Sequence, residues 1–147
     1  MAERNKRNII MKSDKRYTAE QIIYAFAGLN EISNEEEMTI ADAPTILDRK
    51  LVDRIVHDVY FVSSSLIKAL CLPLSTSQLK GKRAIIFISD ELLNQQNKEI
   101  KLNILHEIAH YVLKHKCLFD FEGDGMDKKY MQQEKEADKL VKKWLAS

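Results

Sequence analysis

The sequence has few of the residues that crosslink or interrupt a chain. Its 147 residues include two cysteines, two prolines and four glycines. Cys71 and Cys117 form no C-x-x-C pair, which excludes a zinc knuckle and gives no sign of a disulfide framework. We therefore expect reduced thiols, as in the cytoplasm. The scarcity of glycine and proline leaves little room for linkers, and the length suits one domain.

Neither sign of charge dominates, and long apolar runs are missing. Lys and Arg together number 23, and Asp and Glu together number 22. A net charge this close to zero gives no general attraction to the negatively charged backbone of a nucleic acid. No apolar stretch approaches the roughly 18 residues of a membrane span, and the N-terminus lacks the features of a secretory signal. We expect a cytoplasmic protein with no membrane partner and no direct nucleic-acid binding.

Residues 1–16 differ in composition from the rest of the chain. They are basic and show little apolar periodicity, which predicts a flexible arm. A nucleic-acid-binding arm is the alternative, which the near-neutral total charge and the absence of a helix-turn-helix signature disfavour. Residues 17–147 are predicted to form a single domain.

Helix-start signals mark the first half of this domain. Thr18 with Gln21, and Ser33 with Glu36, have the spacing of a capping box, in which two side chains satisfy free backbone N–H groups. Pro44 suits the first turn of a third helix. The sequence therefore predicts three helices before the first strand.

The second half mixes strand and helix patterns. Short runs rich in β-branched and aromatic residues predict strands at 59–62 and 84–88. Helical patterns cover about 90–116 and 128–145. Together these helices and strands predict an α+β fold, in which helices pack on a small sheet of two or three strands.

The residues with the clearest chemistry are His106-Glu107-Ile108-Ala109-His110, an H-E-x-x-H within a helical pattern. Four residues advance a helix by one turn plus about 40°, so both imidazoles project from one face and can bind one zinc ion. Glu107 lies about 100° from His106, in the position of a general base that reaches a water beside the metal. The alternative is that these are ordinary hydrogen-bonded histidines. Because most of the surface of this helix is apolar, two histidines and a glutamate on its one polar face favour a functional role.

A zinc hydrolase needs a third protein ligand. Lys116 occupies the place of a third histidine six residues after His110, and His115 points about 140° away from His110 if the helix continues. In the C-terminal helix, Glu134 falls within the apolar stripe, whereas Glu136 falls on the solvent face. The periodicity therefore predicts Glu134 as the third ligand, His115 as no ligand and Glu136 as solvent-exposed.

Asp138 follows Glu134 by one turn and shares its buried face. Burying two carboxylates is costly unless they meet a cation, and a zinc ion with its histidines supplies one. We predict one zinc ion per chain, with Asp138 accepting a hydrogen bond from a ligating histidine. Residues 120–125 resemble the start of a calcium-binding loop, but Met131 stands where a bidentate carboxylate is needed.

In these motifs the chain resembles the ImmA/IrrE-type metallopeptidases. The matching features are the strand at 84–88, the H-E-I-A-H helix, the E-x-E-A-D of 134–138 and the helices before the sheet, over about residues 18–145. The resemblance implies a zincin-like core, with zinc between the H-E-x-x-H helix and a C-terminal ligand helix, beneath an edge strand. It also implies an intracellular enzyme of the kind often encoded on phages and mobile elements, several of which cleave repressor-type regulators.

The expected function is that of a zinc-dependent endopeptidase that cleaves a regulatory protein such as a phage or mobile-element repressor, with Glu107 as the catalytic base. The alternative is a non-proteolytic, zinc-stabilised protein that sequesters a transcription regulator. A scaffold of that kind needs only the metal ligands, so the presence of Glu107 favours the enzyme.

Two parts of the expected mechanism stay open at this point. The strand at 84–88 or the strand at 59–62 is expected to align an extended substrate by adding it to the sheet. A hydrogen-bond donor to the oxyanion is also needed, for which Tyr111, Tyr130 and His57 are candidates.

Overall fold

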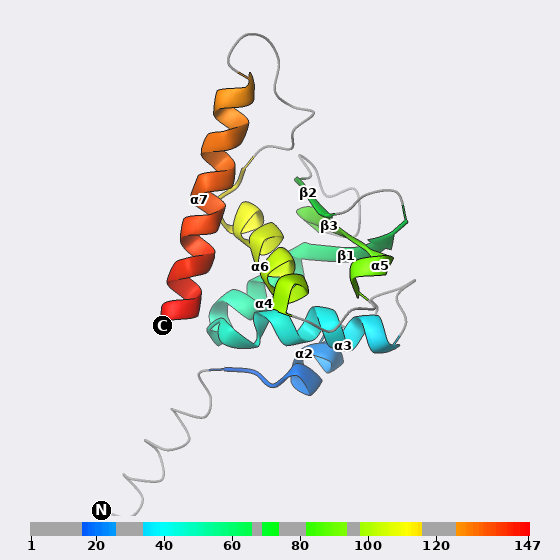
Figure 1. Cartoon of the computed structure of the whole chain (residues 1–147). Coiled ribbons are helices and arrows are strands. Elements are labelled where there is room, and N and C mark those ends of the chain that lie inside the picture. The colour runs from blue at the N-terminus through cyan, green and yellow to red at the C-terminus, as the bar shows by residue number, and fades with distance from the viewer. Residues whose placement is uncertain (1–15, 26–33, 66–68, 74–81, 94–97, 116–125) are drawn as a thin grey trace, which may run out of the picture.

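The computed structural model describes residues 16–25, 34–65, 69–73, 82–93, 98–115 and 126–147. In Figure 1, helix α6 (Lys98–Val112) lies between a three-stranded sheet and the C-terminal helix α7 (Met126–Ala146). The predicted α+β class with a small sheet is confirmed. The predicted arm, apart from Arg16, and the acidic segment 120–125 lie outside the described residues.

In the described part of the chain, the first two helices begin where the capping signals place them. Helix α2 (Ala19–Ala25) carries the predicted capping box: the Thr18 N–H donates to Gln21 Oε1 at 2.9 Å, and the Gln21 N–H donates to Thr18 Oγ1 at 3.2 Å. Helix α3 (Asn34–Asp42) confirms the second predicted helix, although its expected capping residue, Ser33, lies outside the described residues.

The prediction that Pro44 opens the third helix is wrong. Pro44 lies in a separate 3₁₀ turn, η1 (Ala43–Ile46), and α4 (Arg49–Asp58) begins after it. Asp48 caps α4, because its carboxylate accepts a hydrogen bond from the Leu51 N–H at 2.9 Å. An aspartate at this position satisfies a free N–H of the first turn, which proline cannot do, and the helix starts there.

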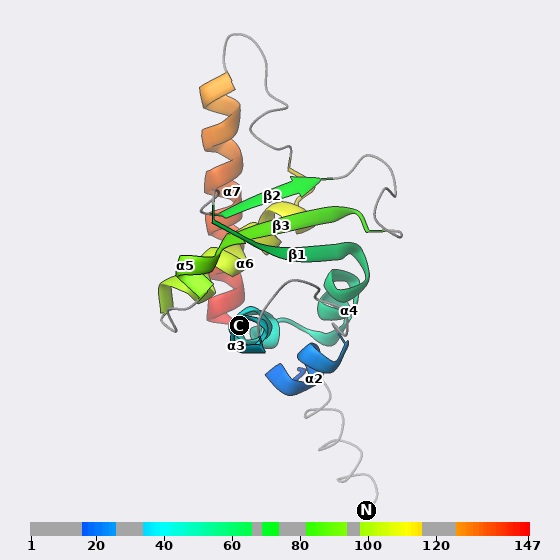
Figure 2. The same cartoon turned by 90° about the vertical axis from the view of Figure 1, so that its right-hand side faces the viewer.

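The sheet contains β1 (Val59–Ser64), β2 (Ala69–Pro73) and β3 (Ala84–Ser89) in the order β1-β3-β2, as Figure 2 shows. Strand β3 pairs in parallel with β1 and antiparallel with β2. The strands expected at β1 and β3 are present, but β2 was not predicted. Because β3 lies in the middle, the expectation that it offers an edge to a substrate is wrong.

The helical pattern expected over 90–116 is two helices. The first is α5 (Asp90–Leu93), the second is α6, and α6 ends four residues earlier than the pattern suggested, at Val112. The C-terminal helix α7 confirms the prediction for 128–145 within two residues at each end.

A sharp reversal of the backbone ends α6. Lys114 adopts a positive φ of 57°, the His115 N–H donates to the His110 carbonyl at 3.0 Å, and the Lys114 N–H donates to the Tyr111 carbonyl at 3.1 Å. This is the Schellman pattern, in which the chain turns back over the last helical turn. The residue that follows Lys114 is therefore carried back toward the side of α6.

Helix α6 is the centre of the core. It packs on β2 and β3 on one side and on α7 on the other. Its buried apolar side chains are Ile100, Ile104, Leu105, Ile108 and Ala109. Among the described side chains of α7, by contrast, Ala137 and Val141 alone are buried. In the described part of the chain, no helix has the length and apolar character needed to cross a membrane.

Candidate metal centre

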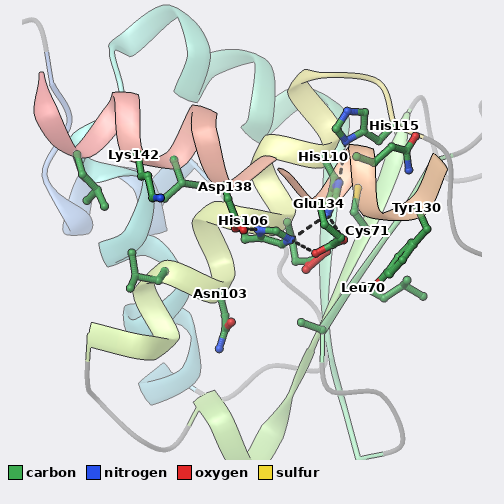
Figure 3. Close-up of a pocket in the computed structure, with 16 residues that line it drawn as sticks. Leu70, Cys71, Asn103, His106, His110, His115, Tyr130, Glu134, Asp138 and Lys142 are labelled. Carbon is green, nitrogen blue, oxygen red and sulfur yellow. Dashed lines mark hydrogen bonds and ion pairs between the residues drawn. The ribbon is translucent and has the colours of Figure 1, made fainter. Parts of the chain in front are cut away.

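Two helices bring three ligand atoms together. His106 and His110 project from α6, and Glu134 projects from α7 between them (Figure 3). His106 Nε2 lies 2.8 Å from Glu134 Oε2, His110 Nε2 lies 3.0 Å from Glu134 Oε1, and the two Nε2 atoms lie 3.0 Å apart. The structure thus places the three predicted ligands in one group.

The chemistry of this group fits a metal ion. Two imidazole nitrogens and a carboxylate oxygen are the donor set of many catalytic zinc sites. Ligand atoms at about 2.0–2.2 Å from a tetrahedral ion lie about 3.3 Å from one another. The three ligand atoms here lie 2.8–3.0 Å apart, so they need to separate by only a few tenths of an ångström to hold an ion. The three side chains could therefore hold a metal ion.

The second ring nitrogen of His106, Nδ1, contacts a carboxylate. His106 Nδ1 lies 2.9 Å from Asp138 Oδ1, although the Asp138 side chain is 65% exposed. A carboxylate that accepts the Nδ1–H leaves Nε2 with its lone pair toward the centre. Asp138 therefore stands where the prediction of a supporting carboxylate requires it, but the prediction that it lies on a buried face is wrong.

His110 is held in the neutral form that a ligand needs. Burial lowers the pKa of its imidazole to about 4, and the neighbouring His106 acts in the same direction. A neutral imidazole at neutral pH offers a lone pair to a metal without first losing a proton.

Glu107 is a buried carboxylate beside the ligand group. Its side chain contacts the same cleft as the ligands, and burial raises its pKa to about 7. The electrostatic interaction with His106 and a hydrogen bond from the Cys71 backbone oppose this rise in pKa, and the charge of Glu134 adds to it. A carboxyl group with a pKa near neutrality exchanges protons readily at physiological pH.

The cleft around these residues has a volume of about 710 Å³. Its walls come from α6, α7 and the edge strand β2. Part of the wall is apolar and comes from Ala69, Leu70, Cys71, Leu102, Tyr130, Val141 and Leu145. The arrangement leaves the ligand atoms reachable from solvent along a partly apolar groove.

The three candidate oxyanion donors lie in different places. Tyr130 lines the cleft, and burial with the charges of Glu134 and Glu107 raises the pKa of its hydroxyl. Tyr111 instead lines a second cavity of about 510 Å³ and donates its hydroxyl to Asp58 Oδ2 at 2.5 Å. The side chain of His57 is 79% exposed and lines neither cavity. Of the three, Tyr130 alone lines the cleft that contains the ligand group.

One expectation about a neighbouring residue is wrong and another is confirmed. His115 does not point away from His110: the reversal after α6 buries its ring, and its Nδ1 lies 2.9 Å from His110 Nδ1. Glu136 is exposed, as predicted, with 45% of its side chain accessible, and its Oε2 also lies 2.9 Å from His115 Nε2. The sequence pattern misplaced His115 because the helix was expected to continue to about residue 116, whereas α6 ends at Val112.

Comparisons with protein-family models, with curated proteins and with solved structures find no match to this chain.

Proposed function

We propose that this chain is a zinc-dependent endopeptidase of the ImmA/IrrE type with a zincin-like core. Its substrate would be a cytoplasmic regulatory protein, such as a repressor of a phage or mobile element. The observation that carries the proposal is the buried Glu107, which lines the same cleft as the three convergent ligand atoms. A metal site that only holds the fold together needs no buried carboxylate beside its ligands.

The roles of the side chains follow from their positions. His106, His110 and Glu134 would hold one zinc ion, which when bound acidifies a water and polarises a carbonyl. Glu107 would take the proton of the attacking water on its carboxylate and pass it to the nitrogen of the leaving amine. Tyr130 would donate its hydroxyl to the developing oxyanion.

Strand β2 is the element best placed to align a substrate. It borders the cleft through Ala69, Leu70 and Cys71, and among the described residues it pairs with β3 alone. An extended peptide could form main-chain hydrogen bonds with the other edge of β2 and so cross the ligand group. We propose β2 for this role in place of the two strands expected from the sequence.

The test compares wild-type protein with Glu107→Gln. The amide keeps the volume of the side chain but cannot accept the proton, and general-base catalysis is typically worth about 10²–10⁴-fold in rate. Each protein is loaded with zinc and incubated with purified repressors encoded beside its own gene. Wild type should cut one of them at a discrete site, and Glu107→Gln should bind zinc and the repressor but cut at least 10²-fold more slowly.

The exposed His57→Ala serves as the matched control and should cut like wild type. If zinc-loaded Glu107→Gln retains the full effect of wild type on repressor-controlled transcription, the protein acts by sequestration and the peptidase proposal is wrong.

A further inference from the structure

A buried histidine outside the ligand group contacts one of the ligands. His115 is 8% exposed, and its Nδ1 lies 2.9 Å from Nδ1 of His110, the nitrogen opposite the one that faces Glu134. The contact follows from the Schellman end of α6, because this motif brings the second residue after the helix cap against the third residue before it. These two residues are His115 and His110.

The other ring nitrogen of His115 contacts a carboxylate on α7. His115 Nε2 lies 2.9 Å from Glu136 Oε2, and the second oxygen of Glu136 accepts a hydrogen bond from Gln132 Nε2 at 3.2 Å. Both oxygens of Glu136 are therefore engaged. Three side chains of different elements thus form the continuous chain Glu136–His115–His110 that ends at the ligand group (Figure 3 shows its last two members).

The chemistry of the groups sets the direction of these hydrogen bonds. An ionised carboxylate only accepts, so His115 donates its Nε2–H to Glu136 and its Nδ1 keeps a lone pair. That lone pair accepts the Nδ1–H of His110, and Nε2 of His110 is left free to bind a cation. The opposite tautomer of His115 would donate to His110 Nδ1 and place the proton of His110 on Nε2, where it blocks a metal.

We propose that His115 and Glu136 are positioning residues that hold His110 in the tautomer and ring orientation needed to bind the metal ion. They serve His110 as Asp138 serves His106, so that helix α7 supplies a ligand and two supporting carboxylates. This inference rests on the proposed zinc centre but not on peptidase turnover.

Zinc affinity, measured by competition with a chromophoric chelator, gives the first test. Partners of ligating histidines are typically worth about 10–100-fold in metal affinity, so His115→Ala should weaken zinc binding by about that factor. His115→Asn should restore most of the affinity, because its Oδ1 stands where Nδ1 stood and can accept from His110. Glu136→Ala should weaken binding, and Glu136→Gln, which keeps an acceptor for His115, should weaken it less.

His57→Ala, an exposed histidine outside the cleft, is the control and should bind zinc like wild type. Circular dichroism of each metal-free variant checks that it folds. If a folded His115→Ala binds zinc as tightly as wild type, the positioning role is refuted while the zinc centre stands. If wild type itself binds no zinc, the centre and this inference both fail.

The tautomers provide a readout that a purely structural role would not change. Nitrogen-15 NMR of the imidazole rings in the zinc-loaded protein should show protons on Nδ1 of His110 and Nε2 of His115. In Glu136→Ala the signals of His115 should move toward the other tautomer or an average of the two. A wild-type protein with a protonated His115 Nδ1, or a tautomer unaffected by Glu136→Ala, would overturn the proposal.

Discussion

Zinc should stabilise α7 more than any other part of the structure. The ligand group joins α6 to α7 through Glu134, and α7 otherwise buries little. Of its described side chains, Ala137 and Val141 are buried, and Leu140 and Trp144 pack against the core in part. An element with so few buried apolar contacts is expected to detach locally well before the whole domain unfolds.

The size of the effect follows from binding linkage. An ion that binds only when α7 is docked stabilises the docked state by RT ln(1 + [Zn]/Kd), which is about 2.7 kcal/mol when free zinc is 100 times Kd. Because about 1.4 kcal/mol is a factor of ten, the detached population should fall by about 100-fold. Amides of α7 that exchange through detachment should slow by the same factor.

Hydrogen exchange with mass spectrometry, with and without zinc, measures this directly. Peptides from α7 should show the slowing of about 100-fold, while peptides from β1 and β3 should change little, since zinc does not touch them. Glu134→Ala should abolish the difference. Equal slowing in all elements, or no slowing in α7 of zinc-loaded protein, would refute the claim that the metal joins these two helices.

Three further outcomes are expected from single substitutions. Asp138→Asn should keep the fold and weaken zinc affinity by about 10-fold, near the lower end of the usual range, because the side chain is largely exposed. An unchanged affinity in a chelator competition would show that Asp138 does not support His106. Lys114→Val should lower the free energy of unfolding by about 1–3 kcal/mol in urea titrations, because a β-branched residue fits poorly at a φ of 57°. Lys114→Gly should not lower it, since glycine adopts this φ readily. Equal stability of the two variants would argue against the helix end described here. Asp48→Ala should cost about 1 kcal/mol, because the Leu51 N–H loses its acceptor, and an unchanged urea midpoint would show that this cap contributes nothing.

The facing directions on α7 were predictable from the sequence. Glu134 and Asp138 both fall on the apolar side of a long helix with regular periodicity, and the structure places both against histidines of α6. The H-E-x-x-H spacing is equally local, because the two imidazoles share a face in any straight helix. Predictions of this kind succeed where one element alone decides the geometry.

The position of His115 could not be derived in this way. It depends on where α6 ends, and the residue with positive φ at that end is Lys114 rather than the glycine that usually signals such a turn. Strand β2 escaped prediction for a similar reason. It has five residues, ends in a proline and is held by pairing with β3, a tertiary contact that leaves little periodic signal.

The central claim is that His106, His110 and Glu134 bind one zinc ion, and crystallography at the zinc absorption edge tests it most directly. Anomalous difference maps of the zinc-loaded protein should show one peak per chain between α6 and α7. It should lie about 2.0–2.2 Å from Nε2 of both histidines and from a carboxylate oxygen of Glu134. A peak bound instead by His115 and Glu136, or no peak in this cleft, would contradict the claim.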